Sequence, residues 1–197
     1  VEMRSGSFEK FKIKGGLGLV SSRISLEGPV IKGKSAFIGG FRSTYSDWIL
    51  KQFNVEEVKN SSAFFYDANL RYTHRINDKN TLILSGYSSN DEFTFNNDFG
   101  FDYGTVIGQM SFKTIFSEKS YSDFSLTFSQ YESTRHELDT IIASRLDNKF
   151  QYLKFKENIH FSPSEGLEMD VGISSILYTV NPGELTPTSE FSTIAPG

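Results

Sequence analysis

The chain contains no cysteine, a single tryptophan and no long run of apolar residues. Without cysteine, its 197 residues form neither a disulfide framework nor a thiolate metal site. Because no run of about 18 apolar residues exists, we expect no transmembrane helix. The net charge of −4 gives no reason to expect a nucleic acid as partner. These absences leave a transmembrane β-barrel open, because barrel strands alternate and their average hydropathy is polar.

Aromatic residues are plentiful, with 19 Phe and 9 Tyr, although only 38% of the chain is hydrophobic and the mean hydropathy is −0.32. The length suits one domain. The sequence begins at Val1 without a signal peptide and ends in the loop-like Ala195-Pro196-Gly197. We therefore expect residues 1–197 to be one part of a longer protein.

Short clusters of Gly, Asn, Asp, Ser and Pro recur along the chain at a spacing of roughly 40–45 residues, and such clusters predict tight turns. They are residues 32–34, 77–80, 117–120 and 162–166. Longer polar stretches lie between them, at residues 54–62, 90–102, 135–148 and from 181 onward. We interpret these stretches as long loops. An alternation of short turns and long loops is typical of outer-membrane barrels.

Between the turns, apolar residues occupy every second position, which predicts strands with one apolar and one polar face. For example, Leu126 is flanked by Ser125 and Thr127. The same alternation runs through residues 64–76, 106–116 and 167–177. We expect eight strands of about 11–15 residues, longer than the average strand of globular proteins. The first of these would cover residues 8–28.

The stretch GGLGLVSSRISLEGPVIKGKSAFIGGFRSTYSDW, residues 15–48, resembles the segment that follows the plug in TonB-dependent outer-membrane receptors of the Bacteroidetes type. The resemblance is carried by Ser21-Ser22-Arg23, by Glu27-Gly28-Pro29 and by the residues 40–47 (GFRSTYSD). The family more often has Arg where this chain has Phe41. Similar stretches continue to about Ser175.

This resemblance implies an all-β fold, an antiparallel transmembrane β-barrel of which residues 1–197 form about eight of 22 strands. It implies energised uptake of a large solute, such as a glycan, peptide or siderophore, across the outer membrane of a Gram-negative bacterium. No enzyme activity, cofactor or nucleic acid is expected. The implied partners are the plug domain, the remaining barrel strands, lipid and lipopolysaccharide, and the TonB complex acting through the plug. A surface lipoprotein is a further partner that the resemblance leaves open.

Two groups of charged residues are candidate site residues. The first group would face the lumen and either guide a solute or pair with the plug and with one another, because charges facing a packed lumen need partners. It comprises Arg23, Glu27, Arg42, Asp67, Arg71 and Lys113. The second group lies in the stretch 90–102 and would either bind a substrate or calcium or belong to a solvated outer loop. It comprises Asp91, Glu92, Asp98 and Asp102.

Other features of the sequence are weaker. The three histidines lack the spacing of a metal site, so we expect no metal or catalytic centre. Residues 46–53 predict either a continuation of the preceding strand or, as we favour, a short helical turn capped by Ser46 or Asp47, with Trp48 at the outer interface. As an alternative function, eight strands are enough to close a small barrel that acts as an anchor or adhesin. A soluble sandwich would need polar outward faces, whereas these are rich in Phe and Leu.

Overall fold

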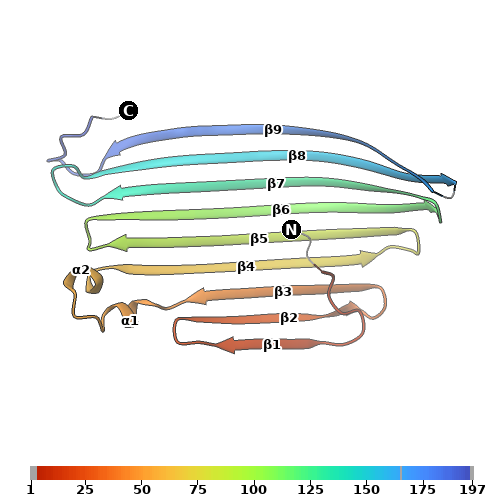
Figure 1. Cartoon of the computed structure of the whole chain (residues 1–197), viewed down its shortest axis with the longest axis horizontal. Coiled ribbons are helices and arrows are strands. Elements are labelled where there is room, and N and C mark those ends of the chain that lie inside the picture. The colour runs from red at the N-terminus through yellow and green to blue at the C-terminus, as the bar shows by residue number, and fades with distance from the viewer. Residues whose placement is uncertain (1–3, 165, 196–197) are drawn as a thin grey trace.

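The computed structural model describes residues 4–164 and 166–195, which form one antiparallel sheet of nine strands. Each strand pairs with the next one along the chain, so that β1 and β9 lie at opposite edges (Figure 1). The strands are β1 Lys12–Leu17, β2 Ser21–Ile31, β3 Ser35–Thr44, β4 Ser62–Arg75, β5 Asn80–Phe95, β6 Phe99–Ser117, β7 Ser120–Glu137, β8 Ser144–Ser164 and β9 Leu167–Pro187.

The connections with the predicted tight turns all lie at one end of the sheet, on the right in Figure 1. At this end β2 turns into β3 through residues 32–34, and Gly33 has a φ of +68°, a conformation that favours glycine. The opposite end carries the 45–61 connection and the 138–143 connection. The predicted tight turns at 32–34, 77–80 and 117–120 are confirmed, whereas the one at 162–166 includes Glu165, which lies outside the described residues.

Two of the predicted long loops are mostly strand. In the stretch 90–102, β5 continues to Phe95 and β6 begins at Phe99. Asn96 and Asn97 have φ of 47° and 56°, and the Asp98 amide donates to the Phe95 carbonyl at 2.8 Å, which closes a tight hairpin turn. The 135–148 stretch is likewise strand at both ends. The loop interpretation was wrong because polar side chains on both faces do not prevent backbone pairing.

The expected count of eight strands is also wrong. Residues 8–28, predicted as one strand, form β1 and β2 with a turn at 18–20, where the Gly18 amide donates to the Ser21 carbonyl at 2.9 Å. This turn contains Leu19 and Val20 and none of the polar residues that mark the other turns. The strands from β5 onward have 16–21 residues, longer than expected, because the hairpins extend into the polar stretches.

Two short helices, α1 Asp47–Leu50 and α2 Glu56–Lys59, lie between β3 and β4. The helical turn predicted within residues 46–53 is confirmed, but its cap is not. The Ser46 side chain makes no capping bond and donates instead to the Ala63 carbonyl, while the Asp47 carboxylate accepts from the Ala63 amide. Within residues 4–164 and 166–195, neither helix has the length and apolar character needed to cross a membrane.

The register gives the sheet one apolar and one polar face, because residues opposite each other on paired strands share a face. We call the face with Leu126 the apolar face; its row runs through Leu84, Met110, Leu126 and Phe155. We call the face with Arg71 the polar face; the adjacent row runs through Arg71, Ser85, Gln109, Thr127 and Lys154. The predicted alternation is therefore confirmed.

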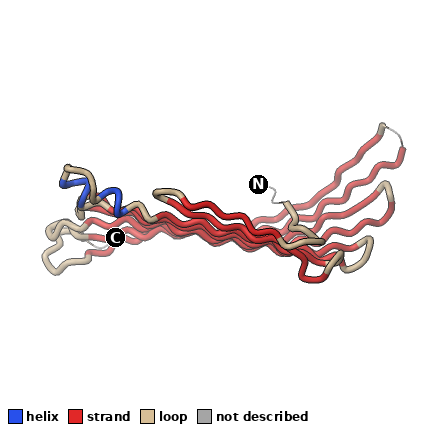
Figure 2. Tube along the Cα trace, turned by 90° about the horizontal axis from the view of Figure 1, so that it is seen from below, coloured by secondary structure: helices blue, strands red, loops and turns tan. Residues whose placement is uncertain are grey.

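No second layer covers the apolar face in the part of the chain that the structure describes. The large apolar side chains of this face are exposed there: Leu126 is 37% and Leu177 68% exposed. Figure 2 shows the sheet as a single layer, seen along its edge. A sandwich would pack this face against another sheet.

The segment before β1 lies across the polar face. Arg4 forms an ion pair with Glu27, and Ser5 accepts a hydrogen bond from Thr73 at 3.4 Å. Phe8 lies 4.0 Å beneath the guanidinium of Arg75. In Figure 2 this segment lies above the sheet, on the side toward which the short-turn ends of the strands curve. Residues 4–8 therefore mark the side of the sheet on which polypeptide packs.

Candidate functional site

All six charged residues predicted to face a lumen lie on the polar face. Arg23 is opposite Arg42, and Arg42 is opposite Asp67, so these three form one row. Four residues away along the strands, Glu27 and Arg71 belong to a second row, joined through β3. Lys113 lies an even number of residues from the polar-face residue Gln109 and therefore shares its face. The structure thus places residues from four strands, β2, β3, β4 and β6, on one face.

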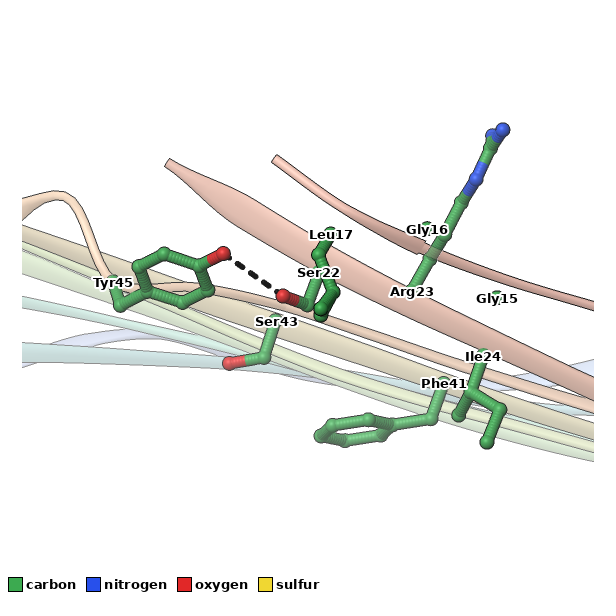
Figure 3. A pocket seen from close by; sticks show the side chains of 9 residues that line it. All are labelled: Gly15, Gly16, Leu17, Ser22, Arg23, Ile24, Phe41, Ser43 and Tyr45. Atoms are coloured by element: carbon green, nitrogen blue, oxygen red, sulfur yellow. Dashed lines mark hydrogen bonds between the residues drawn. The ribbon is translucent and has the colours of Figure 1, made fainter. Parts of the chain in front are cut away.

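Arg42 and Asp67 form a cross-strand ion pair, with Nε of Arg42 2.6 Å from Oδ2 of Asp67. The guanidinium also lies 5.1 Å from the ring centre of Phe65. Among the described residues Arg23 has no such partner, and its side chain points away from Ile24 and Phe41, as Figure 3 shows. Ile24 and Phe41 belong to the opposite face, where they line a shallow apolar hollow of about 390 Å³ beside the β1 edge.

Glu27 is the most enclosed of the six residues, with only 4% of its surface exposed. Its carboxylate lies 2.6 Å from Nη1 of Arg4 and 3.5 Å from Nζ of Lys12. A buried carboxylate needs such partners, because burial of an unpaired charge costs several kcal/mol. Glu27 therefore holds the segment before β1 against the sheet.

A polar hollow of about 500 Å³ lies in the middle of the polar face. Arg71, Ser85, Asp123 and Lys156 are among its lining residues. Nε of Arg71 and Oγ of Ser85 are buried there without a hydrogen-bond partner. Such atoms are rare in folded proteins, because each loses water without gaining a replacement. The hollow is thus the part of the sheet where hydrogen-bond donors remain unused.

The four acidic candidates of the stretch 90–102 do not converge. Asp91 lies opposite Tyr103 on the polar face, whereas Glu92 lies opposite Asp102 on the other face. Asp102 bonds to Nε2 of His136 at 2.7 Å, and Asp98, in the turn, accepts from the side-chain Nδ2 of Asn96 at 2.9 Å. Within the described ranges, no group of three or more His, Asp or Glu residues is arranged to hold a metal ion.

Each histidine contacts a neighbouring strand residue or a residue of its own strand. Besides the His136–Asp102 pair, Nδ1 of His160 lies 2.9 Å from Oδ1 of Asp170, and Nδ1 of His74 lies 3.2 Å from the Tyr72 hydroxyl. The His136 and His160 contacts join neighbouring strands, whereas the His74 contact lies within β4.

We call the end of the sheet that carries the 45–61 and 138–143 connections the loop end. At this end the polar face carries aromatic rings that were not among the predicted site residues. Phe101 stacks on Tyr103 with ring centres 6.1 Å apart, and Tyr103 stacks on Tyr131 at 6.4 Å. A second cluster joins Tyr152 to Tyr178 at 6.2 Å. The signal was present in the sequence, because counting by twos from Lys113 along β6 reaches Tyr103 and Phe101.

Near the loop end, Asp147 on β8 lies opposite Thr134 on β7, and a hydrogen bond between their side chains joins the two strands. Burial raises the pKa of its carboxyl, but hydrogen bonds from Thr134 at 2.6 Å and Arg145 at 2.8 Å outweigh this effect. The net result is a pKa below the ordinary value, so Asp147 is ionised at neutral pH.

Comparison of the chain with protein-family models, with curated proteins and with solved structures gave no match.

Proposed function

We propose that this chain is part of the barrel of a TonB-dependent transporter in the outer membrane of a Gram-negative bacterium, where it takes part in the energised uptake of a large solute. Under this proposal the apolar face contacts lipid and the polar face lines a lumen filled by a plug domain. Further strands complete a barrel of 22. The single observation that carries the proposal is a one-layer antiparallel sheet with an uncovered apolar face and a charged opposite face.

The height of the apolar rows supports a membrane location. On β9 the apolar-face residues run from Leu167 to Leu177. Five of them are more than 45% exposed: Leu167, Met169, Val171, Ile173 and Leu177. Ten residues at about 3.4 Å each span roughly 34 Å along the strand. A strand tilt of about 40° reduces this to roughly 26 Å, close to the apolar band of about 25 Å in outer-membrane barrels.

Polar residues on the apolar face, between the apolar band and the loop end, also support a membrane location. On the apolar side, the rows toward the loop end contain Glu132 opposite Lys149 and Thr134 opposite Asp147. Charged side chains facing lipid would cost free energy, whereas at this distance from the band they would reach the headgroups and water. The loop end would then lie outside the cell and the short turns in the periplasm.

The second candidate, a small closed barrel that serves as an anchor or adhesin, is less well supported. It requires the first and last strands to pair, but β1 and β9 lie at opposite edges of the sheet. Nine strands are also an odd number, whereas bacterial single-chain barrels have an even number. An unpaired edge in lipid would leave rows of amide and carbonyl groups unsatisfied, each costing several kcal/mol.

The proposal is tested on the full-length protein by envelope fractionation and by electrophoresis with and without boiling. We expect it in the outer-membrane fraction with heat-modifiable migration, which is the behaviour of a closed barrel. Residues 1–197 alone, refolded in detergent, should not give a stable monomer in native mass spectrometry. A monodisperse monomer with β1 cross-linked to β9 would instead establish the small closed barrel.

A further inference from the structure

The middle of the polar face is strongly basic although the chain as a whole is acidic. The three neighbouring rows that cross β4 to β8 through Arg71, Thr73 and Arg75 contain five cations and one carboxylate. The cations are Arg71, Arg75, Lys113, Lys154 and Lys156, and the carboxylate is Asp123. We call these residues the basic band. The net charge of the whole chain is −4, so positive charge is concentrated here.

The cations of the basic band are not neutralised within the described residues. The ion pairs found there involve Glu27, Asp67, Asp102, Glu132, Glu137, Asp147 and Asp170, and none joins a carboxylate to the basic band. Nζ of Lys113 lies over the Tyr121 ring at 4.2 Å. Nζ of Lys156 lies 3.0 Å from the side-chain oxygen of Asn158 once the oxygen and nitrogen of that amide are exchanged, the orientation in which both find hydrogen-bond partners. Both are contacts with neutral groups.

Two buried hydrogen-bond donors on the rows of the basic band also lack a partner among the described residues. Arg71 is opposite Ser85, and Nε of the one and Oγ of the other lack partners at the floor of the 500 Å³ hollow. A carboxylate in the hollow would lie beside Lys156, and a rotation of the Arg71 and Ser85 side chains would bring both unpartnered atoms to it. Covering five like charges without opposite charges would be strongly unfavourable. Whatever covers this face must therefore supply acidic groups.

Polypeptide already packs on these rows. Ser5 contacts Thr73, which is only 4% exposed, and Phe8 packs under Arg75. Gly6 lies so close to the sheet that a Cβ there would come within 2.0 Å of the Phe37 carbonyl oxygen. The hollow is lined by residues of the same two rows, those of Thr73 and Arg71, further along toward β8. The neighbouring surface is thus built for backbone at close range.

We propose that the basic band is the docking surface for an acidic polypeptide surface whose Asp and Glu side chains bind Arg71, Lys154 and Lys156. This inference rests on the proposed function, in which the acidic surface belongs to the plug domain of the same protein. It adds the sign of the charge on the facing surface and the residues that bind it.

The test uses the full-length protein in outer membranes and a carbodiimide, which joins a lysine amine directly to a contacting carboxylate. Lys149 and Glu132, 2.8 Å apart at the loop end, provide an internal positive control. We expect Lys154 and Lys156 to be joined to Asp or Glu residues of the plug domain, as identified by mass spectrometry of peptides. Recovery of the Lys149–Glu132 link with no link from Lys154 or Lys156, or with links to Asp123 alone, overturns the proposal.

Charge reversal gives an independent readout. The double variant Lys154→Glu, Lys156→Glu should loosen the plug, which is measured as increased pore conductance in planar bilayers. Lys154→Arg, Lys156→Arg keeps the charge and should conduct like the unaltered protein. Unchanged conductance after charge reversal in a heat-modifiable barrel overturns the docking surface and leaves the barrel intact, whereas failure to find any outer-membrane barrel overturns the proposed function itself. Loss of solute uptake without plug loosening would assign the basic band to an anionic solute instead.

Discussion

Arg42 on β3 and Asp67 on β4 lie directly opposite each other on the polar face, with Nε and Oδ2 2.6 Å apart. The Arg42 side chain is 54% exposed and that of Asp67 17% when the polar face is uncovered. The strength of this pair therefore depends on what lies over it. An ion pair in contact with water contributes at most about 1 kcal/mol, whereas a hydrogen bond to a charged group shielded from water contributes about 1.5–3 kcal/mol.

This relationship gives a first prediction. In the full-length protein, a double-mutant cycle of Arg42→Ala and Asp67→Ala should give a coupling energy of about 1.5–3 kcal/mol, because the proposed plug excludes water from the pair. The measurement is the free energy of unfolding in denaturant, for the two single variants and the double variant. A coupling of only a few tenths of a kcal/mol would show that the polar face remains open to solvent.

The two faces are compared by placing the same residue at adjacent positions of β7. Leu126→Arg should reduce the free energy of unfolding in bilayers by about 2–4 kcal/mol, because the side chain would face hydrocarbon. Ser125→Arg should cost much less, because Ser125 lines the 500 Å³ polar hollow and leaves room for the side chain. Equal costs at the two positions would disprove either the assignment of faces or the membrane location.

The two ends of the sheet should lie on opposite sides of the membrane. Asp98→Cys, in the β5–β6 turn, should react with a membrane-impermeant thiol reagent on intact cells. Asp78→Cys and Glu118→Cys, in turns at the other end, should react only after the outer membrane is permeabilised. Residues 1–197 contribute no background cysteine. Labelling of Asp78→Cys on intact cells, with Asp98→Cys silent, would reverse the orientation.

The close approach of residues 4–8 to the sheet should be sensitive to a single methyl group. Gly6→Ala would bring the new Cβ within 2.0 Å of a backbone oxygen, which a side-chain rotation does not relieve. We expect a cost of about 1–3 kcal/mol and faster trypsin cleavage after Arg4 and Lys10 in detergent-solubilised protein. Gly86→Ala is the matched control, because its Cβ would have no heavy atom within 4 Å. Cleavage rates that do not differ between the two variants would argue against the packing of this segment.

Much of the sheet could be predicted because its signals are local. The alternation around Leu126 requires only neighbouring residues, since successive side chains of a strand point to opposite faces. Tight turns such as that at Gly33 depend on a few residues with special backbone preferences. The placement of Arg71 and Lys113 on the polar face follows from the same alternation, once the apolar residues define the other face.

The hairpin ends were harder to predict. The stretch 90–102 has the composition of a loop, yet it pairs through Phe95 and Phe99 because the partner strand supplies hydrogen bonds along its whole length. The Asn96-Asn97 pair, both with positive φ, was the local signal for the turn. Conversely, the turn at Gly18 lies in an apolar context, so its composition resembled that of a strand.

The strand period, most of the tight turns and the residues of each strand that share a face follow from local sequence, because these properties depend on residues close together in the chain. The number of strands, the packing of residues 4–8 on the polar face and the meeting of Arg71 with Lys156 in one hollow emerge only in the folded sheet. Those features depend on pairing between strands distant in sequence, and the register of that pairing is set by hydrogen bonds and side-chain contacts across the whole sheet.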